Sequence, residues 1–381
     1  MIEPVEFFDA LATEGVQFVA GVPDSLLKEA CRYVDAVLPR ERHVIAANEG
    51  GAVALAAGHY LATGTVPLVY LQNSGIGNAV NPLLSLVDPE VYAMPIVLLI
   101  GWRGEPGVKD EPQHVKQGRI TPAMLDAMEI PYRVLDGDEA AGLDAVRWAV
   151  ARARDRGGPT ALLARKGAFA KAGLQDDEPA SLPLTREAAI EWVVTALEPG
   201  TTVVATTGMI ARELYEFRRR AGLDGSRDFL TVGSMGHASQ IALGIASARP
   251  GRKVACLDGD GAALMHLGGL ATIGLSAPRS FLHVVLNNGA HDSVGGQPTA
   301  GFAIDVPGVA RACGYAAVAG PVEEAQDVTQ AIQELQAGVG PTFLEVRVAR
   351  GARPDLGRPK EPPLENVQRF VTHLREELGS V

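Results

Sequence analysis

The sequence predicts an α/β protein built from two homologous, doubly wound parallel-sheet domains. Short apolar runs bounded by glycine alternate with helical patterns along the 381 residues, as is typical of parallel βα units. The pattern occurs twice, and three pairs of landmarks are each separated by 186 residues: Gly58 and Gly244, Ser74 and Asp260, Trp102 and Asn288. The length also favours more than one domain. Chance similarity between two unrelated α/β domains is the alternative.

The first half contains four predicted strands, at residues 16–22, 43–47, 66–71 and 95–100. Each run ends in a polar or glycine-containing segment, as expected where a strand leads into a helix. A helical pattern follows the first strand at 26–37, and a small-residue segment follows the second at 49–60. The loops should therefore gather at the carboxyl ends of the strands, where such sheets bind their ligands.

The second half repeats this order. Its predicted strands are 201–205, 229–232, 253–257 and 281–286, with helices at 210–219 and 237–248. A further strand at 342–348 and a terminal helix at 365–378 complete it. Residues 173–186 begin with a polar, proline-containing stretch and are predicted to be a linker. The two domains are therefore expected at 1–172 and 187–381.

The composition fits a globular protein and argues against some partners. A net charge of −11 disfavours nucleic acid and anionic membranes, because both bind broad basic surfaces. The acidic N-terminus does not resemble a signal peptide, and no apolar stretch approaches the roughly 20 residues that cross a bilayer. The scattered cysteines, Cys31, Cys256 and Cys313, are expected to be core residues of a protein in the reducing cytoplasm.

The strongest chemical motif lies in the second half. Asp258-Gly259-Asp260-Gly261 follows a predicted strand, and Asn288 stands at the end of the next one, 28 residues after Asp260. Glycine allows close backbone approach to a ligand, and a helix N-terminus attracts an anion such as a diphosphate. Asp260 and Asn288 would supply oxygen ligands to Mg²⁺. The alternative for Asp260 alone is a helix cap.

This pair of motifs resembles the cofactor motif of thiamine diphosphate enzymes, and the first half contains the complementary segment of that family. Asn48-Glu49-Gly50-Gly51-Ala52 is similar to the segment whose glutamate hydrogen-bonds the aminopyrimidine ring. The resemblance implies that Glu49 drives the ring to its imino form, which deprotonates the thiazolium carbon. The apolar and small neighbours of Glu49 would desolvate its carboxylate and favour proton sharing. The alternative is a first-turn acid that faces solvent.

Further cofactor contacts follow from the same resemblance. Gly233-Ser234-Met235-Gly236 is similar to the segment in which a bulky apolar side chain bends the cofactor. Met235 would take this role, and the Gly233 carbonyl would accept from the 4′-amino group; Met235 as core filler is the alternative. The other implied cofactor contacts are Thr207, Gly259, Gly261 and Ala262, and the Ala290 carbonyl is implied as a third Mg²⁺ ligand.

The resemblance covers nearly the whole chain, with a pyrimidine-binding domain first and a diphosphate-binding domain second. The chain has no room for the extra central domain of pyruvate decarboxylase. In residues 21–25, 101–105 and 288–297 the sequence is similar to phosphonopyruvate decarboxylases, and sulfopyruvate decarboxylases are the next most similar group. Pyruvate decarboxylases have a catalytic glutamate near the position of Val294 and a histidine pair where His114 stands alone. Because the facing domains come from different subunits in this family, the resemblance implies at least a homodimer.

The implied reaction is the decarboxylation of a small anionic 2-oxo acid, most closely phosphonopyruvate, in phosphonate biosynthesis. A phosphonate needs cationic partners, and residues 103–119 form a charged segment that is predicted to be a mobile loop over the site. A solvated surface loop explains this segment almost as well. The candidate substrate residues are Ser25, Arg103, Lys109, Arg119 and His291. The candidates for proton transfer are Asp24 and His114 first, then His237, His291 and Asp292.

Other functions remain as alternatives. A sulfopyruvate decarboxylase, or a carboligase, would keep the same cofactor. A non-catalytic thiamine diphosphate-binding protein would not need an intact Glu49. A metal-dependent nucleotide-binding enzyme is disfavoured because the sequence lacks a phosphate-binding G-x-x-x-x-G-K-[ST] loop.

Overall fold

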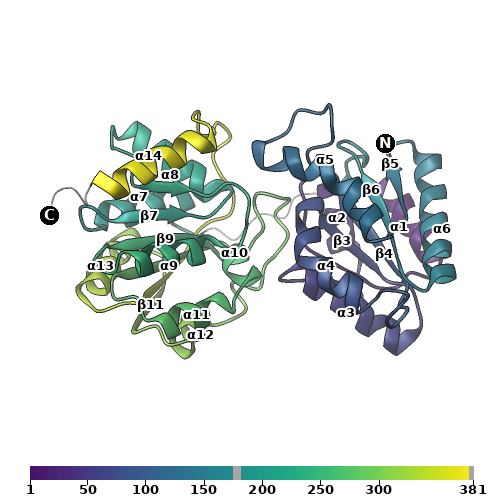
Figure 1. Cartoon of the computed structure of the whole chain (residues 1–381), viewed down its shortest axis with the longest axis horizontal. Coiled ribbons are helices and arrows are strands. Elements are labelled where there is room, and N and C mark those ends of the chain that lie inside the picture. Colours follow the sequence, from purple (N-terminus) through teal and green to yellow (C-terminus); the bar gives the residue numbers. More distant parts are fainter. Residues whose placement is uncertain (175–181, 377–381) are drawn as a thin grey trace. The chain divides into compact units, whose positions relative to one another are not determined.

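The computed structural model describes residues 1–174 and 182–376 (Figure 1). The described residues form two compact units, residues 1–174 with 291–297, and residues 182–290 with 298–376. The predicted linker, 173–186, includes residues 175–181, which lie outside the described part. Of its described residues, Thr185 caps the first helix of the second unit and Arg186 opens that helix.

The first unit contains a six-stranded parallel sheet with the order β2-β1-β3-β4-β6-β5. Its strands are β1 (Val19–Gly21), β2 (His43–Ile45), β3 (Leu68–Gln72), β4 (Ile96–Gly101), β5 (Tyr132–Leu135) and β6 (Pro159–Ala164). Its helices are α1 (Pro4–Thr13), α2 (Lys28–Val37), α3 (Glu49–Thr63), the 3₁₀ helix η1 (Asn73–Gly75), α4 (Ile76–Ser85), α5 (Pro112–Ala127) and α6 (Glu139–Arg156).

Helices cover both faces of this sheet, so the domain is doubly wound. On one face, α1, α2 and α6 contribute buried residues such as Phe7, Val34 and Val146 to a first core. On the other face, α3, α4 and α5 contribute to a second core. The central strands are accordingly apolar on both sides, and every residue of β4 is buried. Such continuous apolar runs are characteristic of parallel sheets.

The second unit has a sheet of the same kind, with the order β11-β12-β10-β9-β7-β8. Its strands are β7 (Thr202–Ala205), β8 (Asp228–Leu230), β9 (Val254–Gly259), β10 (Phe281–Asn287), β11 (Ala317–Val322) and β12 (Thr342–Arg347). Its helices are α7 (Arg186–Ala196), α8 (Met209–Arg220), α9 (Ala238–Ala248), α10 (Asp260–Met265), α11 (Gly269–Ser276), α12 (Val306–Ala312), α13 (Ala325–Ala337) and α14 (Pro363–Glu376). Two cores again flank the sheet.

The two sheets share one topology. Read from β8, the second order is β8-β7-β9-β10-β12-β11, which matches β2-β1-β3-β4-β6-β5 strand for strand. Strands β3 and β9 also begin 186 residues apart, at Leu68 and Val254. The pairing with the next strand differs by two residues, since Leu68 pairs with Val97 but Val254 pairs with Phe281. The predicted fold class, two homologous doubly wound α/β domains, is confirmed.

Several predicted boundaries are corrected. The expected mobile loop at 103–119 is wrong from Pro112 onward, because α5 begins there with proline in its first turn. Strand β9 extends through Asp258 and Gly259, two residues beyond the end of the strand predicted at 253–257. Cys31 and Cys256 are buried as expected, whereas Cys313 is half-buried. Among the helices in the described ranges, none is both long and apolar enough to cross a membrane.

Candidate active site

Polar side chains gather at the carboxyl edge of the first sheet. The chain leaves β1 through Asp24 and Ser25, and Glu49 opens α3 shortly after β2. The ends of β3 and β4 lead into η1 and into Trp102 and Arg103. Because parallel strands all end at the same edge, the topology brings these separate segments together.

The Glu49 carboxylate is buried, bonded by Asn78 and closely packed against Gly75. Its side chain is 5% exposed, so the solvent-facing alternative is wrong. The Asn78 amide donates to Oε2 of Glu49 at 2.7 Å, and Asn48 caps α3 by accepting from the Gly51 N–H. Burial raises the pKa of Glu49, whereas the Asn78 bond lowers it. A Cβ on Gly75 would overlap the Glu49 carboxylate, so a larger residue there would push the carboxylate out of its present position. Glu49 can therefore share a proton with a partner placed against it.

Asp24 is fully buried at the end of β1. Its Oδ2 accepts from the backbone N–H groups of Leu26 and Leu27 at 2.9 and 3.2 Å. Its other oxygen, Oδ1, is buried and has no hydrogen-bond partner within residues 1–174 and 182–376. Burial raises the pKa of Asp24 to about 6, although Arg103 and the backbone bonds oppose this. Such a carboxyl group can exchange a proton near neutral pH.

Arg103 is held in one orientation. Its Nε and Nη2 donate to the two oxygens of Asp110, and its Nη1 donates to Oγ of Ser25 at 2.7 Å. Asp110 also accepts from the backbone N–H of Gly104. The guanidinium beside Asp110 lowers the pKa of that carboxyl well below its ordinary value. A fixed guanidinium next to Ser25 and Asp24 is suited to bind an anionic group.

The other candidates in residues 103–119 are placed differently. His114 lies in the first turn of α5 and is buried, and its Nδ1 has no hydrogen-bond partner in the part of the chain that the structure describes. Burial and the charge of Arg103 lower the pKa of His114, so its imidazole is neutral at neutral pH. Lys109 and Arg119 are exposed, as is Lys116. The structure thus brings Arg103, Ser25 and Asp24 together but does not add Lys109 or Arg119 to them.

The second sheet carries Asp260 at its own carboxyl edge. Asp260 is the first residue of α10 and is 3% exposed. Gly259 is the residue that caps this helix, so the cap alternative for Asp260 is wrong. The Thr299 hydroxyl donates to Oδ2 of Asp260, and the backbone N–H of Asn288 also favours the charged carboxylate. Burial nevertheless raises the pKa of Asp260 to about 6.

These residues fit a bound cation. Asn288 follows β10 directly, and its Oδ1 accepts from the backbone N–H of Ala290 at 3.0 Å. The main groups that favour the charged form of Asp260 are neutral donors, so no cation among the described residues is a main partner of its carboxylate. Carboxylate, amide and carbonyl oxygens are the ligands that Mg²⁺ takes from proteins. Asp260, Asn288 and Ala290 offer one of each within a short stretch of this edge.

The remaining predicted cofactor residues lie at the ends of β7, β8 and β9. The backbone N–H of Gly233 donates to Oγ1 of Thr207 at 3.1 Å, which joins the loops that follow β7 and β8. The backbone has positive φ at Gly233, Ser234 and Gly236. Glycine adopts this conformation freely, whereas at Ser234 it is strained, as is common at functional sites. Met235 is half-buried, so it is not core filler. Gly261 and Ala262 are buried in α10.

A small loop follows the metal-binding candidates. Residues 291–297 close on themselves, because the His291 N–H donates to the Gln297 carbonyl and the Gly296 N–H donates to the His291 carbonyl. His291 and Asp292 are half-buried. His237 is exposed and packs beside His266, with ring centroids 4.4 Å apart.

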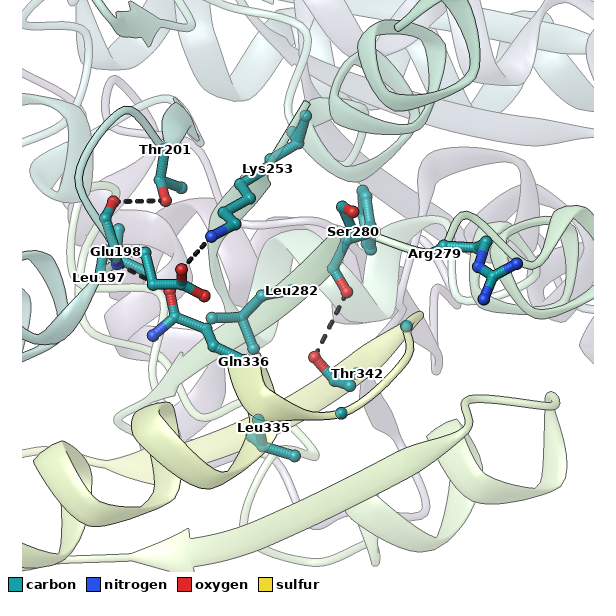
Figure 2. A pocket seen from close by; sticks show the side chains of 14 residues that line it. Leu197, Glu198, Thr201, Lys253, Arg279, Ser280, Leu282, Leu335, Gln336 and Thr342 are labelled. Carbon is teal, nitrogen blue, oxygen red and sulfur yellow. Dashed lines mark hydrogen bonds and ion pairs between the residues drawn. The ribbon is translucent and has the colours of Figure 1, made fainter. Parts of the chain in front are cut away.

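A cavity in the second unit lies at the opposite edge of the sheet (Figure 2). It encloses about 60 Å³ around the starts of β9, β10 and β12. Its polar groups are largely occupied: Lys253 pairs with Glu198, and the Thr201 and Thr342 hydroxyls donate to backbone carbonyls. Cofactor pockets are several times larger and lie at carboxyl edges. This cavity is therefore not the candidate site.

Four residues that support the site are absent from the sequence-based prediction. Asn78 bonds Glu49, Asp110 holds Arg103 and Thr299 bonds Asp260. Asn73 accepts from the Arg103 N–H and donates to its carbonyl, which fixes the start of the loop after β4. Asn78 could have been predicted as a site residue because it is a polar residue within an otherwise apolar helix. Asn73 could have been predicted because it lies near two predicted strand ends.

The fold and these two sets of edge residues define a cofactor-dependent α/β enzyme with two homologous domains. Residues 6–130 match the thiamine pyrophosphate enzyme, N-terminal TPP binding domain, and residues 203–346 match the thiamine pyrophosphate enzyme, C-terminal TPP binding domain. The chain belongs to the thiamine pyrophosphate enzyme family. Thiamine diphosphate is its cofactor class, and the enzyme is a carboxy-lyase.

Individual relatives align along almost the entire chain. A phosphonopyruvate decarboxylase of Streptomyces hygroscopicus is 38% identical over 97% of this chain and 93% of its own length. A second, from Streptomyces viridochromogenes, is 38% identical over 97% of this chain and 94% of its own length. A sulfopyruvate decarboxylase of Methanosarcina acetivorans is 26% identical over 98% of both chains.

Proposed function

We propose that this chain decarboxylates phosphonopyruvate to phosphonoacetaldehyde and CO₂, with thiamine diphosphate and Mg²⁺. The observation that supports this substrate most directly is the 38% identity to two phosphonopyruvate decarboxylases over 97% of the chain. Identity to the sulfopyruvate decarboxylase is lower, at 26% over a similar length. In the reaction the bond between the keto carbon and the carboxylate breaks, and a proton takes the place of CO₂ on that carbon.

Glu49 is the proposed partner of the cofactor's aminopyrimidine ring. Its burial disfavours the free carboxylate, and Asn78 orients the group. A carboxyl group in this state can share a proton with a ring nitrogen placed against it. The bound cofactor supplies a carbon nucleophile and an electron sink. Met235 and the Gly233 carbonyl, on the strained loop after β8, are proposed to hold the cofactor's bent shape.

Asp260, Asn288 and the Ala290 carbonyl are the proposed Mg²⁺ ligands. The buried charge of Asp260 supports this role, since a cation would relieve the cost of its ionisation. The N-terminus of α10 and the loops at Thr207 and Gly259 are proposed to bind the diphosphate. Gly261 and Ala262 complete this set at the first turn of α10.

Arg103 and Ser25 are the proposed partners of the substrate's anionic groups. Arg103 has five N–H donors, of which Asp110 and Ser25 engage three, so donors remain for a phosphonate or carboxylate. Asp24 and His114 are proposed to move the proton that replaces CO₂. The raised pKa of Asp24 and the neutral imidazole of His114 suit that step near neutral pH. Lys109, Arg119 and His291 have less support as substrate-binding residues, and the first two are exposed.

The first experiment is an assay of CO₂ release from phosphonopyruvate by the purified protein. Thiamine diphosphate and Mg²⁺ are each supplied or omitted after dialysis against a chelator. We expect turnover that requires both. The assay is repeated with sulfopyruvate and pyruvate, because the relatives include sulfopyruvate decarboxylase. Faster turnover of sulfopyruvate would move the substrate assignment and leave the cofactor assignment intact. Failure of all three substrates despite cofactor binding would favour the non-catalytic alternative.

We also propose a homodimer in which Glu49 of one chain and Asp260 of its partner serve the same site. A related sulfopyruvate decarboxylase of Methanothermobacter thermautotrophicus has separate alpha and beta subunits, which supports an assembly of more than one chain. A mixture of Glu49→Gln and Asp260→Asn chains, refolded or coexpressed, tests it. Each variant alone should be inactive, whereas a hybrid dimer with one intact site should recover part of the activity. No recovery in a mixture that forms hybrids would contradict shared sites.

A further inference from the structure

A chain of buried polar groups lies in the core beneath Asp260. Asp258 and Cys256 stand on β9, and His283 on β10 pairs in register with Cys256. All three are completely buried. Tyr315, which follows α12, is also buried, and its hydroxyl lies 3.1 Å from Nδ1 of His283. The proposed chemistry does not use any of these side chains, although a buried charge is costly unless it has a partner.

The orientation of His283 links Tyr315 to Asp258. Nε2 of His283 faces Oδ2 of Asp258 at 3.5 Å, slightly longer than an ordinary hydrogen bond of about 2.7–3.2 Å. Neither atom has another hydrogen-bond partner among the described residues. Burial raises the pKa of Tyr315 well above its ordinary value, so its hydroxyl stays protonated and can donate to Nδ1. The imidazole proton then lies on Nε2 and points toward Asp258.

The second oxygen of Asp258 connects this chain to the edge of the sheet. Oδ1 of Asp258 accepts from the backbone N–H of Gly259 at 3.0 Å. Gly259 is the last residue of β9 and the cap of α10, and Asp260 follows it as the first helical residue. The direction in which Asp260 leaves the strand therefore depends on how Asp258 is held.

We propose that Tyr315 and His283 are positioning residues that hold Asp258, and through it the Gly259 turn, so that Asp260 is oriented for its divalent cation. The inference rests on the proposed function, because it concerns the Mg²⁺ assigned to Asp260. Partners behind the direct ligands of a metal typically change its affinity about 10- to 100-fold when they are removed. Tyr315 lies further from the cation than such partners, so its effect should fall at the lower end.

The same cluster does not meet the requirements of a second metal site. Cys256, Asp258 and His283 offer three ligand atoms within 4.8 Å of one another, whereas a structural zinc site is almost always four-coordinate. Burial and the charge of Asp258 raise the pKa of Cys256 well above its ordinary value, which favours a neutral thiol over a metal thiolate. The arrangement fits a hydrogen-bonded relay better than an ion.

The test measures Mg²⁺ affinity rather than turnover. Calorimetry follows thiamine diphosphate binding to the full-length protein at increasing Mg²⁺, and yields the Mg²⁺ concentration for half-saturation. Tyr315→Phe removes only the hydroxyl. His283→Leu removes the link to Asp258, and His283→Gln restores a donor there. Tyr70→Phe is the matched control, because the Tyr70 hydroxyl forms a comparable buried bond with His43, at 3.0 Å, in the other unit.

We expect Tyr315→Phe to raise the half-saturating Mg²⁺ about 3- to 10-fold and His283→Leu at least about 10-fold. His283→Gln should recover part of the loss, and Tyr70→Phe should match the wild type. A purely structural role would instead lower the cofactor-free melting temperature of each variant and leave the Mg²⁺ requirement unchanged, which would overturn the inference. Binding by the wild type without Mg²⁺ would overturn the metal assignment as well. A stoichiometric transition metal that is lost in Cys256→Ala would replace the relay with a metal site.

Discussion

The Asn78 amide donates to Oε2 of Glu49 at 2.7 Å, and this bond is the main interaction that opposes the effect of burial on the Glu49 carboxyl. Asn78 lies in the first turn of α4, whereas Glu49 opens α3, so the bond joins two segments that follow different strands. It both orients Glu49 and sets how readily the carboxyl releases its proton.

Asn78→Ala should therefore move the acidic limb of the pH–rate profile upward. Burial raises the pKa of Glu49, and loss of the Asn78 bond would raise it further. A bond to a charged group contributes about 1.5–3 kcal/mol, so we expect a displacement of roughly one pH unit, equivalent to about 1.4 kcal/mol. The profile is measured as kcat/KM for CO₂ release. Gln330→Ala, which removes an exposed amide-to-carboxylate bond to Glu334, is the control; equal profiles for the two variants would contradict this role.

Gly75→Ala should disable Glu49 without unfolding the protein. A Cβ at Gly75 would overlap Oε1, Cδ and Cγ of Glu49, and the flexible carboxylate must move aside. Displacement of a reacting group by about 1 Å can cost about 100-fold in rate, and we expect a loss of kcat of that size. The control is Gly251→Ala, since a Cβ there meets no atom within 4 Å. If Gly75→Ala keeps full turnover, the placement of Glu49 against Gly75 is not important for the reaction.

The fold was largely predictable because parallel sheets leave a strong pattern in the sequence. Central strands such as β4 are buried on both faces and therefore form continuous apolar runs. Edge strands leave a weaker pattern: β11 contains no buried residue, and only Leu135 of β5 is buried. Both lie outside the predicted strands, and so does β6, although every one of its residues is buried. Helix α5 was mistaken for a loop because residues 103–119 contain glycine, proline and several charges, although Pro112 is a helix-start signal.

The candidate site was predictable only where its residues belong to motifs at strand ends. Asp260 and Asn288 follow strands directly, and Glu49 stands shortly after β2, so parallel topology decides their positions. Asp110 and Thr299 reach their partners through side-chain bonds across 7 and 39 residues. Such bonds depend on loop conformation and leave no periodic pattern. For the same reason, the sequence could not show that Arg103 belongs to the site while Lys109 and Arg119 do not. All three are cationic, and they differ in burial, which depends on the conformation of the loop.

Asp110→Asn should weaken the recognition of phosphonopyruvate, which carries a phosphonate in addition to its carboxylate. The variant replaces one carboxylate oxygen with an NH₂ group, which breaks half of the fork that holds Arg103. We expect kcat/KM for phosphonopyruvate to fall about 10-fold or more, mainly through KM, and kcat/KM for pyruvate to change less. The matched control is Asp144→Asn, which affects an exposed pair with Arg133 in the same unit. An equal loss for both substrates would indicate that Arg103 does not discriminate by charge.

Asp24→Asn should abolish turnover and stabilise the folded protein, and the gain in stability should be larger at pH 8 than at pH 4. Burial raises the pKa of Asp24 from 3.8 to about 6 in the folded protein. The folded state then binds more protons than the unfolded state between about pH 4 and 6, so the stability of the wild type falls as the pH rises through that range. Asparagine still offers an oxygen to the Leu26 and Leu27 N–H groups but carries no charge. The variant should gain about 3 kcal/mol at pH 8 and almost nothing at pH 4. Melting temperatures of the cofactor-free protein at both pH values, alongside turnover, test this. A pH-independent difference in stability, or retained turnover, would show that Asp24 is not the buried proton carrier proposed for this site.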